Sequence, residues 1–412
     1  MQVSARGSPP GSQVKVKTME DIYILSGART AIGSFGGSLA SLRPAELGAI
    51  VMEEAIRRSG ISALDIQNVV VGNVVPSQPK DAYISRVASV NAGVPVSSQA
   101  MNVNRLCGSG LQAIVSAAQA IALGEHDFAI GAGAESMSNA PHMTSSARNG
   151  VRMGNVVFED AMLGALHDPF EGIHMGVTAE NIASQCQISR EEQDALAVES
   201  HKRAAKAIAE GHFKDQIVPV EIKSRKGTKV FDTDEHVRAD ASLEGMASLK
   251  AVFRKDGTVT AGNASGLNDG AGAVVLASGK AVAAKGLKPL ARILAWGHAG
   301  VEPSVMGLGP VKAVPIAIER AGLSLDQIDV IESNEAFAAQ ACGVAKQLGL
   351  DPAKTNPNGS GISLGHPIGA TGAILTIKTI YELKRTGGKY GLISMCIGGG
   401  QGIAMVIENV ED

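Results

Sequence analysis

The chain of 412 residues has only four cysteines, few aromatic side chains and no long apolar run. Four cysteines cannot form a disulfide framework, so the sequence favours a reducing compartment, and we expect a cytoplasmic protein. No apolar stretch approaches the roughly 18 residues that a membrane span requires, which argues against insertion into a membrane. Because aromatic residues make up only 3% of the chain, Ala, Val and Ile must fill most of its core.

A strong charge of either sign is also missing. The net charge is −3, so no overall field would attract nucleic acid or an anionic membrane surface. The sequence has no Cys-x-x-Cys or His-Glu-x-x-His pattern and no Walker lysine. Gly131 and Gly133 form a Gly-x-Gly pattern, but Glu135 and Ser136 follow where a dinucleotide fingerprint would continue toward glycine. We therefore expect neither a metal nor a resident cofactor.

Glycine is abundant, with 49 residues, or about 12% of the chain against a typical ~7%. Three glycine-rich segments carry reactive side chains. Residues 104–110 read Asn-Arg-Leu-Cys-Gly-Ser-Gly, residues 365–369 read Gly-His-Pro-Ile-Gly, and residues 394–400 read Ser-Met-Cys-Ile-Gly-Gly-Gly. Two thiols and one imidazole on glycine loops indicate covalent chemistry combined with a proton transfer.

Each of these three residues has a functional and a structural interpretation. Cys107 opens a helix-like run over 110–123, where helix amides would favour its thiolate and glycines would let a thioester carbonyl approach backbone N–H groups. Alternatively, it is a small buried hydrophobe. His366, poorly placed for core packing, could deprotonate Cys107 or be a turn histidine without a role. Cys396 could remove a proton from a bound acyl group, with its thiol open to ligand, or simply end a strand.

Strand-like and helix-like runs alternate along the chain, which predicts an α/β protein. Residues 55–62 (Ala-Ile-Arg-Arg-Ser-Gly-Ile-Ser) are echoed by residues 317–324 (Ala-Ile-Glu-Arg-Ala-Gly-Leu-Ser). Each copy continues into a β-branched strand and then reaches a glycine loop that opens a helix, at Cys107 in one copy and at His366 in the other. We interpret this as a duplicated α/β unit. A generic helix–turn–strand likeness is the alternative.

The composition changes between the two copies, where histidines and methionines accompany a long polar helical run over 189–210. We interpret this part as an insertion that carries substrate-binding surface. The predicted organisation is a disordered tail at 1–18, a first half made of 19–138 and 268–289, an inserted loop domain at 139–267, and a second half at 290–412.

Two further loops are candidates for the site. Residues 331–337 read Ile-Glu-Ser-Asn-Glu-Ala-Phe. Asn334 could position a water or a carbonyl oxygen while Glu335 holds the loop, or it could cap a helix over 335–348. The small residues of 261–270 indicate backbone pressed against a ligand, with a turn-rich linker as the alternative.

Together, segments 104–110, 333–337, 365–372 and 396–400 strongly resemble the motifs of the thiolases. The likeness runs from about residue 22 to the C-terminus and includes the spacings and the place of the insertion. It implies a duplicated five-layered α-β-α-β-α architecture with an inserted loop domain. It also implies acyl-CoA substrates, with coenzyme A as a substrate or product rather than a cofactor, and a homotetramer built as a dimer of dimers.

The resemblance further implies a two-step Claisen condensation that is reversible as thiolysis. Cys107 would take an acyl group from one CoA thioester, and His366 would activate Cys107 and help to bind a thioester oxygen. Cys396 would deprotonate the methyl group of a second acetyl-CoA. Asn334 would hold an oxyanion-hole water, and the amides of Cys107 and Gly398 would form a second oxyanion hole.

Residues 172–176, Gly-Ile-His-Met-Gly, look like the pantetheine-contacting loop of short-chain, biosynthetic-type thiolases. The similarity is to bacterial β-ketothiolases of short and medium chain length, including those that supply polyhydroxyalkanoate synthesis. It implies acetyl-CoA C-acetyltransferase activity, with a medium- or long-chain 3-ketoacyl-CoA thiolase of β-oxidation as the alternative. The residues expected to contact CoA or the acyl group are Leu166, His174, Met175, Arg238, Phe253, Ala261, Ser265, Met306 and Phe337.

Three other classes of protein compete with this interpretation. A β-ketoacyl synthase would share the fold and Cys107 but should have a second histidine where Cys396 stands. A Cys–His hydrolase would release free acid and would have no use for the second thiol. A thiolase-like lipid-transfer protein should lack one member of the trio Cys107, His366 and Cys396, and all three are present.

Overall fold

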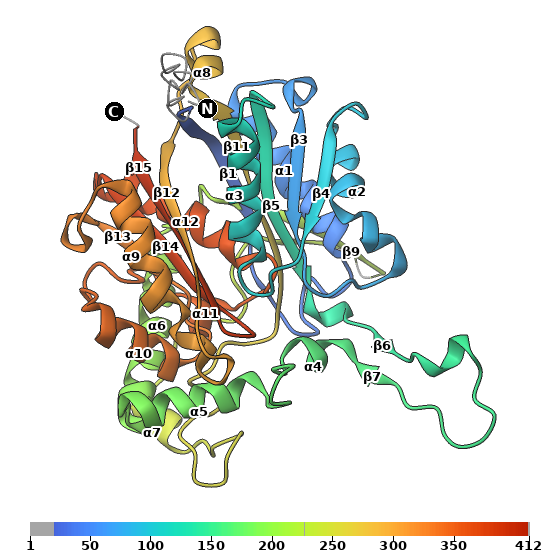
Figure 1. Ribbon diagram of the computed structural model, residues 1–412, viewed down its shortest axis with the longest axis vertical. Helices are drawn as coiled ribbons and strands as arrows, with labels where there is room; N and C mark the ends of the chain where they lie inside the picture. Colours follow the sequence, from blue (N-terminus) through green and yellow to red (C-terminus); the bar gives the residue numbers. More distant parts are fainter. Residues whose placement is uncertain (1–19, 226, 411–412) are drawn as a thin grey trace, which may run out of the picture.

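The computed structural model describes residues 20–225 and 227–410, so the tail expected at 1–18 lies outside the described residues. A mixed sheet of 11 strands runs through the molecule (Figure 1). Its main order is β13-β14-β15-β12-β1-β11-β5-β3-β4, with β2 paired to β11 and β8 paired to β1. The strands of this sheet are β1 (Ile22–Thr30), β2 (Gly33–Ser34), β3 (Asn68–Gly72), β4 (Gln99–Val103), β5 (Phe128–Ser136), β8 (Ile217–Val218), β11 (Asn268–Ser278), β12 (Ala291–Gly300), β13 (Val330–Ser333), β14 (Tyr390–Ile397) and β15 (Gln401–Asn409).

Helices cover both faces of this sheet. They are α1 (Pro44–Ser59), α2 (Ile84–Asn91), α3 (Ser109–Ala122), α4 (Ala161–Ala165), α5 (Met175–Cys186), α6 (Arg190–Ala209), α7 (Leu243–Ala247), α8 (Gly279–Lys285), α9 (Gly309–Ala321), α10 (Ala338–Leu348), α11 (Gly361–Leu364) and α12 (Thr371–Thr386). In the described part of the chain, every helix is too short or too polar to cross a bilayer.

Five layers follow from how the strands bury both of their faces. In β3, Val69 and Val71 pack in the cluster that contains α1, whereas Val70 packs in the cluster that contains α3 and α12. On the outer face of the second half, α9 packs against β14 and β15. From one side of the molecule to the other, the layers are helices α1 and α2, then the first part of the sheet, then helices α3 and α12. The second part of the sheet follows, and helices α9 and α10 form the last layer. Covered strands read as continuous apolar runs, which is why the sequence shows them clearly. The predicted fold class is confirmed.

The internal repeat has a structural counterpart. Helices α1 and α9 both end at a left-handed glycine, Gly60 with φ 77° and Gly322 with φ 68°. Each is followed by a 3-10 turn and then by a parallel strand, β3 or β13. Further along, the two copies reach α3 and α12, which lie together in the middle layer.

Two glycines allow α3 and α12 to meet at their first turns. A Cβ on Gly110 would lie 2.9 Å from the backbone nitrogen of Ala373, and a Cβ on Gly372 would collide with the backbone of Leu111. Any larger residue would push the helices apart. Because both helices begin here, this contact brings the loop of Cys107 and the loop of His366 to one place.

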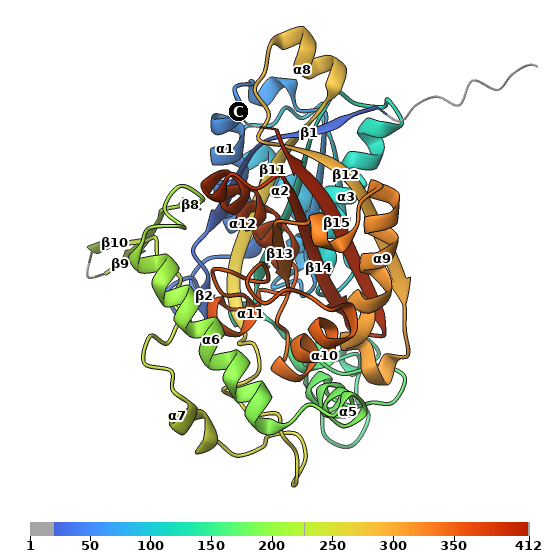
Figure 2. The same ribbon diagram turned by 90° about the vertical axis from the view of Figure 1, so that its left-hand side faces the viewer.

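Between β5 and β11 only the short strand β8 joins the main sheet. The rest of this segment forms α4 to α7 and two small hairpins, β6 (His142–Met143) with β7 (Glu159–Asp160) and β9 (Val220–Ser224) with β10 (Gly227–Phe231). The arm around β6 and β7 projects away from the body (Figure 1). Figure 2 shows α6 running along the outside of α11 and α10. A fully buried ion pair, 2.8 Å long, connects Arg29 of β1 to Asp234 in the segment between β5 and β11 and so holds that segment on the sheet.

Candidate active site

A strained turn presents Cys107. Leu106 has a left-handed backbone with φ 46°, which costs a non-glycine residue about 1–2 kcal/mol. Side chains on both sides hold the turn. Leu106 N–H donates to Asn104 Oδ1 at 3.1 Å, and Ser109 Oγ accepts from Arg105 N–H at 2.8 Å. Helix α3 begins at Ser109, so Cys107 lies just before a helix N-terminus, as the sequence predicts.

Two backbone amides face the thiol of Cys107. Its Sγ is within hydrogen-bonding reach of its own N–H and of Gly398 N–H. Gly398 can come this close because a Cβ there would be only 3.1 Å from Leu106 and 3.3 Å from Met175. Burial raises the pKa of the Cys107 thiol to about 11, and the charge of Glu135 adds to this. At neutral pH the group is a thiol, so it needs a base before it can attack.

The imidazole of His366 is buried and held in one tautomer. Its Nδ1 lies 2.6 Å from Thr371 Oγ1, and that hydroxyl donates its only proton to Pro367 O at 2.9 Å. Thr371 therefore accepts from Nδ1–H, which leaves a lone pair on Nε2. Burial lowers the pKa of His366 to about 4, so the ring is neutral at physiological pH and can act as a base. The expectation that this loop histidine is poorly placed for packing is wrong, because α11 and α12 enclose the loop.

Asn334 lies at the end of β13 and faces this imidazole. Its Nδ2 is 3.4 Å from His366 Nε2, a long contact, and its buried Oδ1 has no hydrogen-bond partner among the described residues. A buried polar atom without a partner is a natural place for a water or a substrate atom. Helix α10 begins at Ala338 with Phe337 at its N-cap position, so the alternative interpretation of Asn334 as a helix cap is wrong.

Cys396 is enclosed rather than open. It lies in β14, and the chain turns back at once into β15 through Gly399 and Gly400, both left-handed, with φ 81° and 86°. Its thiol is fully buried in an apolar cluster with Met175 and Met306. The expectation that the glycines leave this thiol open to ligand is therefore wrong, because side chains from distant parts of the chain cover it. Burial, and then the nearby charge of Cys107, raise the pKa of Cys396.

Backbone contacts join these groups into one site. Asn334 N–H donates to the carbonyl of Ser394, two residues before Cys396, at 2.9 Å. The Gly398 amide reaches Cys107, and Asn334 reaches His366. The structure thus gathers the four side chains that the sequence singles out, from loops that follow β4, β13 and α11 and from the end of β14.

Glu135 is a residue that sequence reasoning missed. Its carboxylate is fully buried and accepts hydrogen bonds from the N–H groups of Val74, Val75 and Gly369, at 2.9, 3.1 and 2.8 Å. Burial raises its pKa to about 8. Since Gly369 belongs to the His366 loop, Glu135 ties that loop to the first half of the chain. In the sequence it interrupts a glycine pattern and gives no other signal.

The residues expected near the acyl group form the walls around the thiols. Met175, Met306 and Phe337 lie in the cluster with Cys396, and Phe253 packs against it. Leu166 and Cys107 pack against a neighbouring cluster.

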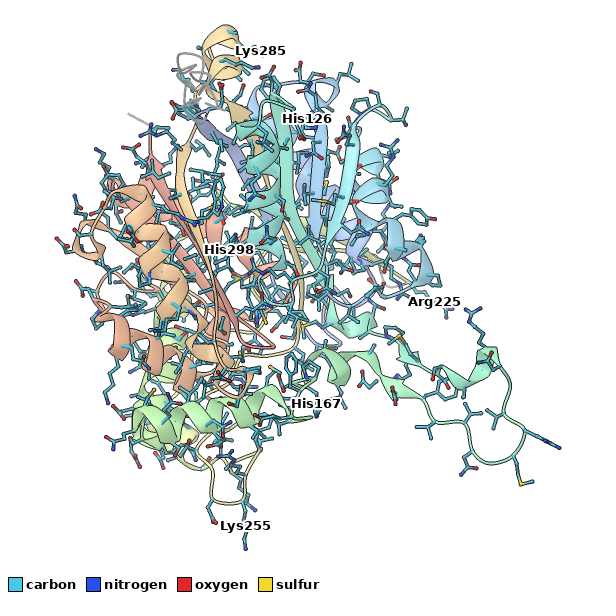
Figure 3. All side chains as sticks on the ribbon, in the orientation of Figure 1. His126, His167, Arg225, Lys255, Lys285 and His298 are labelled. Carbon is cyan, nitrogen blue, oxygen red and sulfur yellow. The ribbon has the colours of Figure 1, made fainter. Side chains whose placement is uncertain are left out.

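His174 caps α5 by accepting from Gly176 N–H at 3.0 Å, and its ring stacks on Phe253 with 4.7 Å between ring centroids. His167, which Figure 3 places beside α4 and α5, meets His174 edge-on at 5.2 Å. His174 and Phe253 thus form a stacked pair beside the apolar cluster that contains Cys396.

Two of the residues expected to contact CoA line a separate cavity of about 280 Å³. Arg238 and Ala261 lie in its wall together with His201 and His236. Ala264 belongs both to this wall and to the surroundings of Cys396, so the cavity adjoins the site. The neighbouring Ser265 donates its N–H to Ala336 O at 3.0 Å. Sequence reasoning missed the two histidines, which lie in a polar helix and a charged stretch without a motif. Within residues 20–225 and 227–410, no group of side chains is arranged to hold a metal ion.

Comparisons with known proteins agree with this geometry. Residues 22–280 match the model of the thiolase N-terminal domain, and residues 287–409 match that of the thiolase C-terminal domain. The chain is 62% identical to the β-ketothiolase BktB of Cupriavidus necator over 95% of its own length and 99% of that protein. It is 48% identical to an acetyl-CoA acetyltransferase of Shinella zoogloeoides, over 94% and 98%. The chain belongs to the thiolase family.

Solved structures show the same likeness. The crystal structure of the Bacillus anthracis acetyl-CoA acetyltransferase superposes with a TM-score of 0.93 at 46% identity, covering 95% of this chain and 99% of that chain. Human mitochondrial 3-ketoacyl-CoA thiolase superposes with a TM-score of 0.93 at 42% identity, with the same coverage. The fold alone therefore accommodates relatives whose names indicate different substrates.

Proposed function

We propose that this protein is an acyl-CoA:acetyl-CoA C-acyltransferase that condenses two molecules of acetyl-CoA into acetoacetyl-CoA and CoA, and catalyses the reverse thiolysis. The observation that carries the proposal is a site with two neighbouring thiols, two amides within reach of the first, and a neutral imidazole that Asn334 connects to the strand of the second. The names of the relatives, β-ketothiolase and acetyl-CoA acetyltransferase, support the same reaction. CoA enters as substrate and leaves as product, and no other cofactor takes part.

In the first half-reaction, His366 Nε2 takes the thiol proton as Cys107 Sγ attacks the thioester carbonyl. The oxyanion of the tetrahedral intermediate accepts hydrogen bonds from the N–H groups of Cys107 and Gly398. The carbon–sulfur bond to CoA then breaks, and the CoA thiolate leaves with the proton of Cys396. The products are acyl-Cys107, an imidazolium at His366 and a thiolate at Cys396, whose charge the imidazolium stabilises.

In the second half-reaction, the Cys396 thiolate removes a methyl proton from the incoming acetyl-CoA. The thioester oxygen becomes an enolate oxygen, which is bound by Nε2–H of His366 and by a water on Asn334. The new carbanion attacks the acyl carbonyl, and a carbon–carbon bond replaces the bond to Cys107 Sγ. Cys107 recovers its proton from His366, so every proton is returned.

We expect Thr371→Val to lower kcat by ~10- to 100-fold, because the imidazole would lose the partner that fixes its tautomer and orientation. Thr371→Ser keeps the hydroxyl and is the matched control, with kcat close to wild type. Steady-state condensation kinetics check both variants. Wild-type activity in Thr371→Val, or a loss in Thr371→Ser as large as in Thr371→Val, would refute this role of the hydroxyl.

Chain length should be limited by the side chains that enclose Cys396. Met175, Met306 and Phe337 leave room for a short acyl group, although methionine can repack. Each extra methylene should therefore cost about 1–3 kcal/mol at most. We expect the highest kcat/KM with acetoacetyl-CoA, and lower values with 3-ketovaleryl- and 3-ketohexanoyl-CoA. Faster cleavage of 3-ketohexadecanoyl-CoA than of acetoacetyl-CoA would instead assign the enzyme to degradative, long-chain metabolism.

The experiment for the proposal as a whole is to follow the products of acetyl-CoA alone and of acetoacetyl-CoA with CoA. Acetoacetyl-CoA plus free CoA should form in the first case, and acetyl-CoA in the second. Release of acetate without carbon–carbon bond formation would identify a Cys–His hydrolase and refute the proposal.

The proposed assembly is a homotetramer built as a dimer of dimers. Its support is the projecting arm around β6 and β7, which exposes apolar side chains that one subunit alone leaves uncovered. They include Met143, Met153, Val157 and Phe158. Light scattering should give four subunits for the wild type, and replacing 146–158 with a short glycine–serine turn should give two. A monomeric wild type would refute the assembly.

A further inference from the structure

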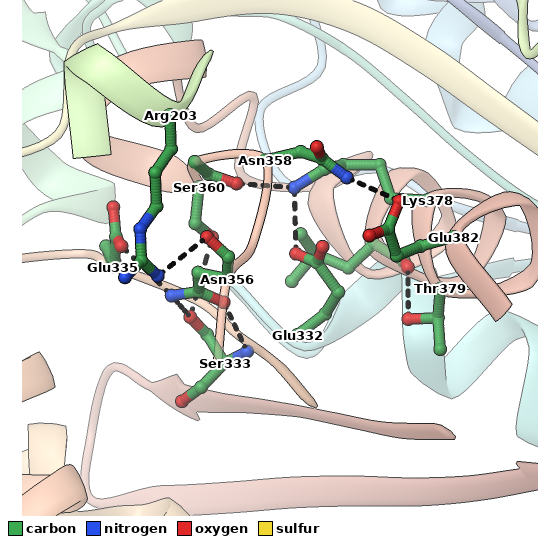
Figure 4. Close-up of polar contacts among 12 residues, drawn as sticks. Arg203, Glu332, Ser333, Glu335, Asn356, Asn358, Ser360, Lys378, Thr379 and Glu382 are labelled. Carbon is green, nitrogen blue, oxygen red and sulfur yellow. Dashed lines mark hydrogen bonds and ion pairs between the residues drawn. The ribbon is translucent and has the colours of Figure 1, made fainter. Parts of the chain in front are cut away.

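The residue after Asn334, Glu335, is directed away from His366. Glu335 is buried on the opposite side of the loop, where successive residues of an extended segment face opposite directions. Its Oε1 accepts from Asn356 Nδ2 at 2.9 Å, and its Oε2 accepts from Ser200 Oγ of α6 at 2.6 Å. Figure 4 shows Glu335 and Asn356 next to each other, with Arg203 beside them. The carboxylate therefore links the loop to two distant segments.

Asn356 holds the residue on the other side of Asn334. Its Oδ1 accepts from Ser333 N–H at 2.9 Å, and its Nδ2 donates to Ser333 O at 2.8 Å (Figure 4). Its own backbone is left-handed, with φ 48°, a conformation that asparagine tolerates better than most residues. One buried side chain thus fixes both residues that flank Asn334.

Packing does not provide the same restraint. A cavity of about 650 Å³ lies between α6 and α10, and Ser333, Glu335 and Asn356 line its inner wall. The outer side of the loop therefore faces open space, whereas Gly361 packs closely against Asn334 and Glu335 elsewhere. On this side its position depends on the hydrogen bonds to Asn356 and Ser200, in addition to the backbone hydrogen bond from Asn334 to Ser394.

We propose that Asn356 and Ser200, acting through Ser333 and Glu335, are positioning residues for Asn334. They hold its amide at His366 Nε2 and keep Oδ1 in place for the enolate-binding water. This inference rests on the proposed function. His366 is fixed separately by Thr371, and Cys107 by its own turn. Loss of the positioning residues should therefore impair the second half-reaction and leave the first intact.

The test compares two asparagines of the same loop. Asn356→Gly removes the side chain but tolerates the left-handed backbone. Asn358 is the matched control, because it is buried to the same degree, 6% exposed against 5%, and donates to Glu382 Oε2 at 2.8 Å instead (Figure 4). Two rates are measured in each variant: acetylation of Cys107 by acetyl-CoA, from intact mass, and exchange of the methyl protons of acetyl-CoA with deuterium.

We expect Asn356→Gly to slow methyl exchange by ~10- to 100-fold while acetylation stays within about threefold of wild type, since small displacements of positioned groups cost this much. Asn358→Gly should leave the ratio of the two rates unchanged. Equal loss of both rates in Asn356→Gly, or the same selective loss in Asn358→Gly, would overturn the proposal.

Ser200→Ala provides a smaller change at the other end of the contact, should Asn356→Gly fail to fold. It should slow exchange by ~3- to 10-fold without affecting acetylation, in the range expected for the loss of one ordinary hydrogen bond. Unchanged exchange in Ser200→Ala would refute the role of α6. Failure of the proposed function would look different, because wild-type enzyme would then not exchange the methyl protons of acetyl-CoA.

Discussion

Replacing Cys107 by serine is expected to abolish acyl transfer, with kcat lowered by ~10⁴-fold or more, as is usual when a covalent nucleophile is lost. The serine hydroxyl would accept hydrogen bonds from the same two backbone amides and would have the same base, His366. It is nevertheless a far weaker nucleophile than a thiolate. Wild-type protein mixed with acetyl-CoA should gain the mass of one acetyl group, and the Cys107→Ser variant should gain none.

The matched control for this experiment is Cys186→Ser. Cys186 ends α5, and its sulfur accepts from Gln347 Nε2 at 3.3 Å, away from the site. This variant should acetylate and turn over like wild type. An adduct that persists in Cys107→Ser would show that another residue takes the acyl group.

Replacing Cys396 by alanine should separate the two half-reactions. Acetylation of Cys107 should continue, because a CoA thiolate is a competent leaving group and can take its proton from water. Exchange of the acetyl-CoA methyl protons should fall by ~10²- to 10⁴-fold, the usual contribution of a general base. Condensation should fall with it.

Deuterium exchange followed by NMR checks this result, and a thermal melt shows whether the cavity left by the sulfur has destabilised the fold. Cys396→Ser is the size-matched companion. It should behave like the alanine variant, because a hydroxyl is a much weaker acid than a thiol. Normal exchange in either variant would refute Cys396 as the base.

Much of this fold is visible in the sequence because its strongest signals are local. The Ser189–Glu192 capping box marks the start of α6, and both of its hydrogen bonds are present. The apolar runs of the strands and the echo of residues 55–62 at 317–324 likewise depend on neighbours in the chain. The contact between α3 and α12 explains why both reactive loops are rich in glycine.

What the sequence could not show depends on contacts between distant residues. Cys396 looks open beside three glycines, but Met175 and Met306 cover it from more than one part of the chain. The role of Thr371 depends on the direction of one hydroxyl proton, which no spacing reveals. Asn356 reaches the loop of Asn334 only because the turn that carries it returns beside β13, where Thr355 forms a β-bridge with Ile331.

The most direct test of the account is to locate the acetyl group on the Cys396→Ala variant after brief exposure to acetyl-CoA, acid quenching and peptide mapping. The account predicts a single acetyl group on the peptide that contains Cys107, formed at close to the wild-type rate and not consumed by further acetyl-CoA. The absence of an adduct on Cys107 in this variant, with wild-type protein acetylated at Cys396, would contradict the assignment of the two thiols.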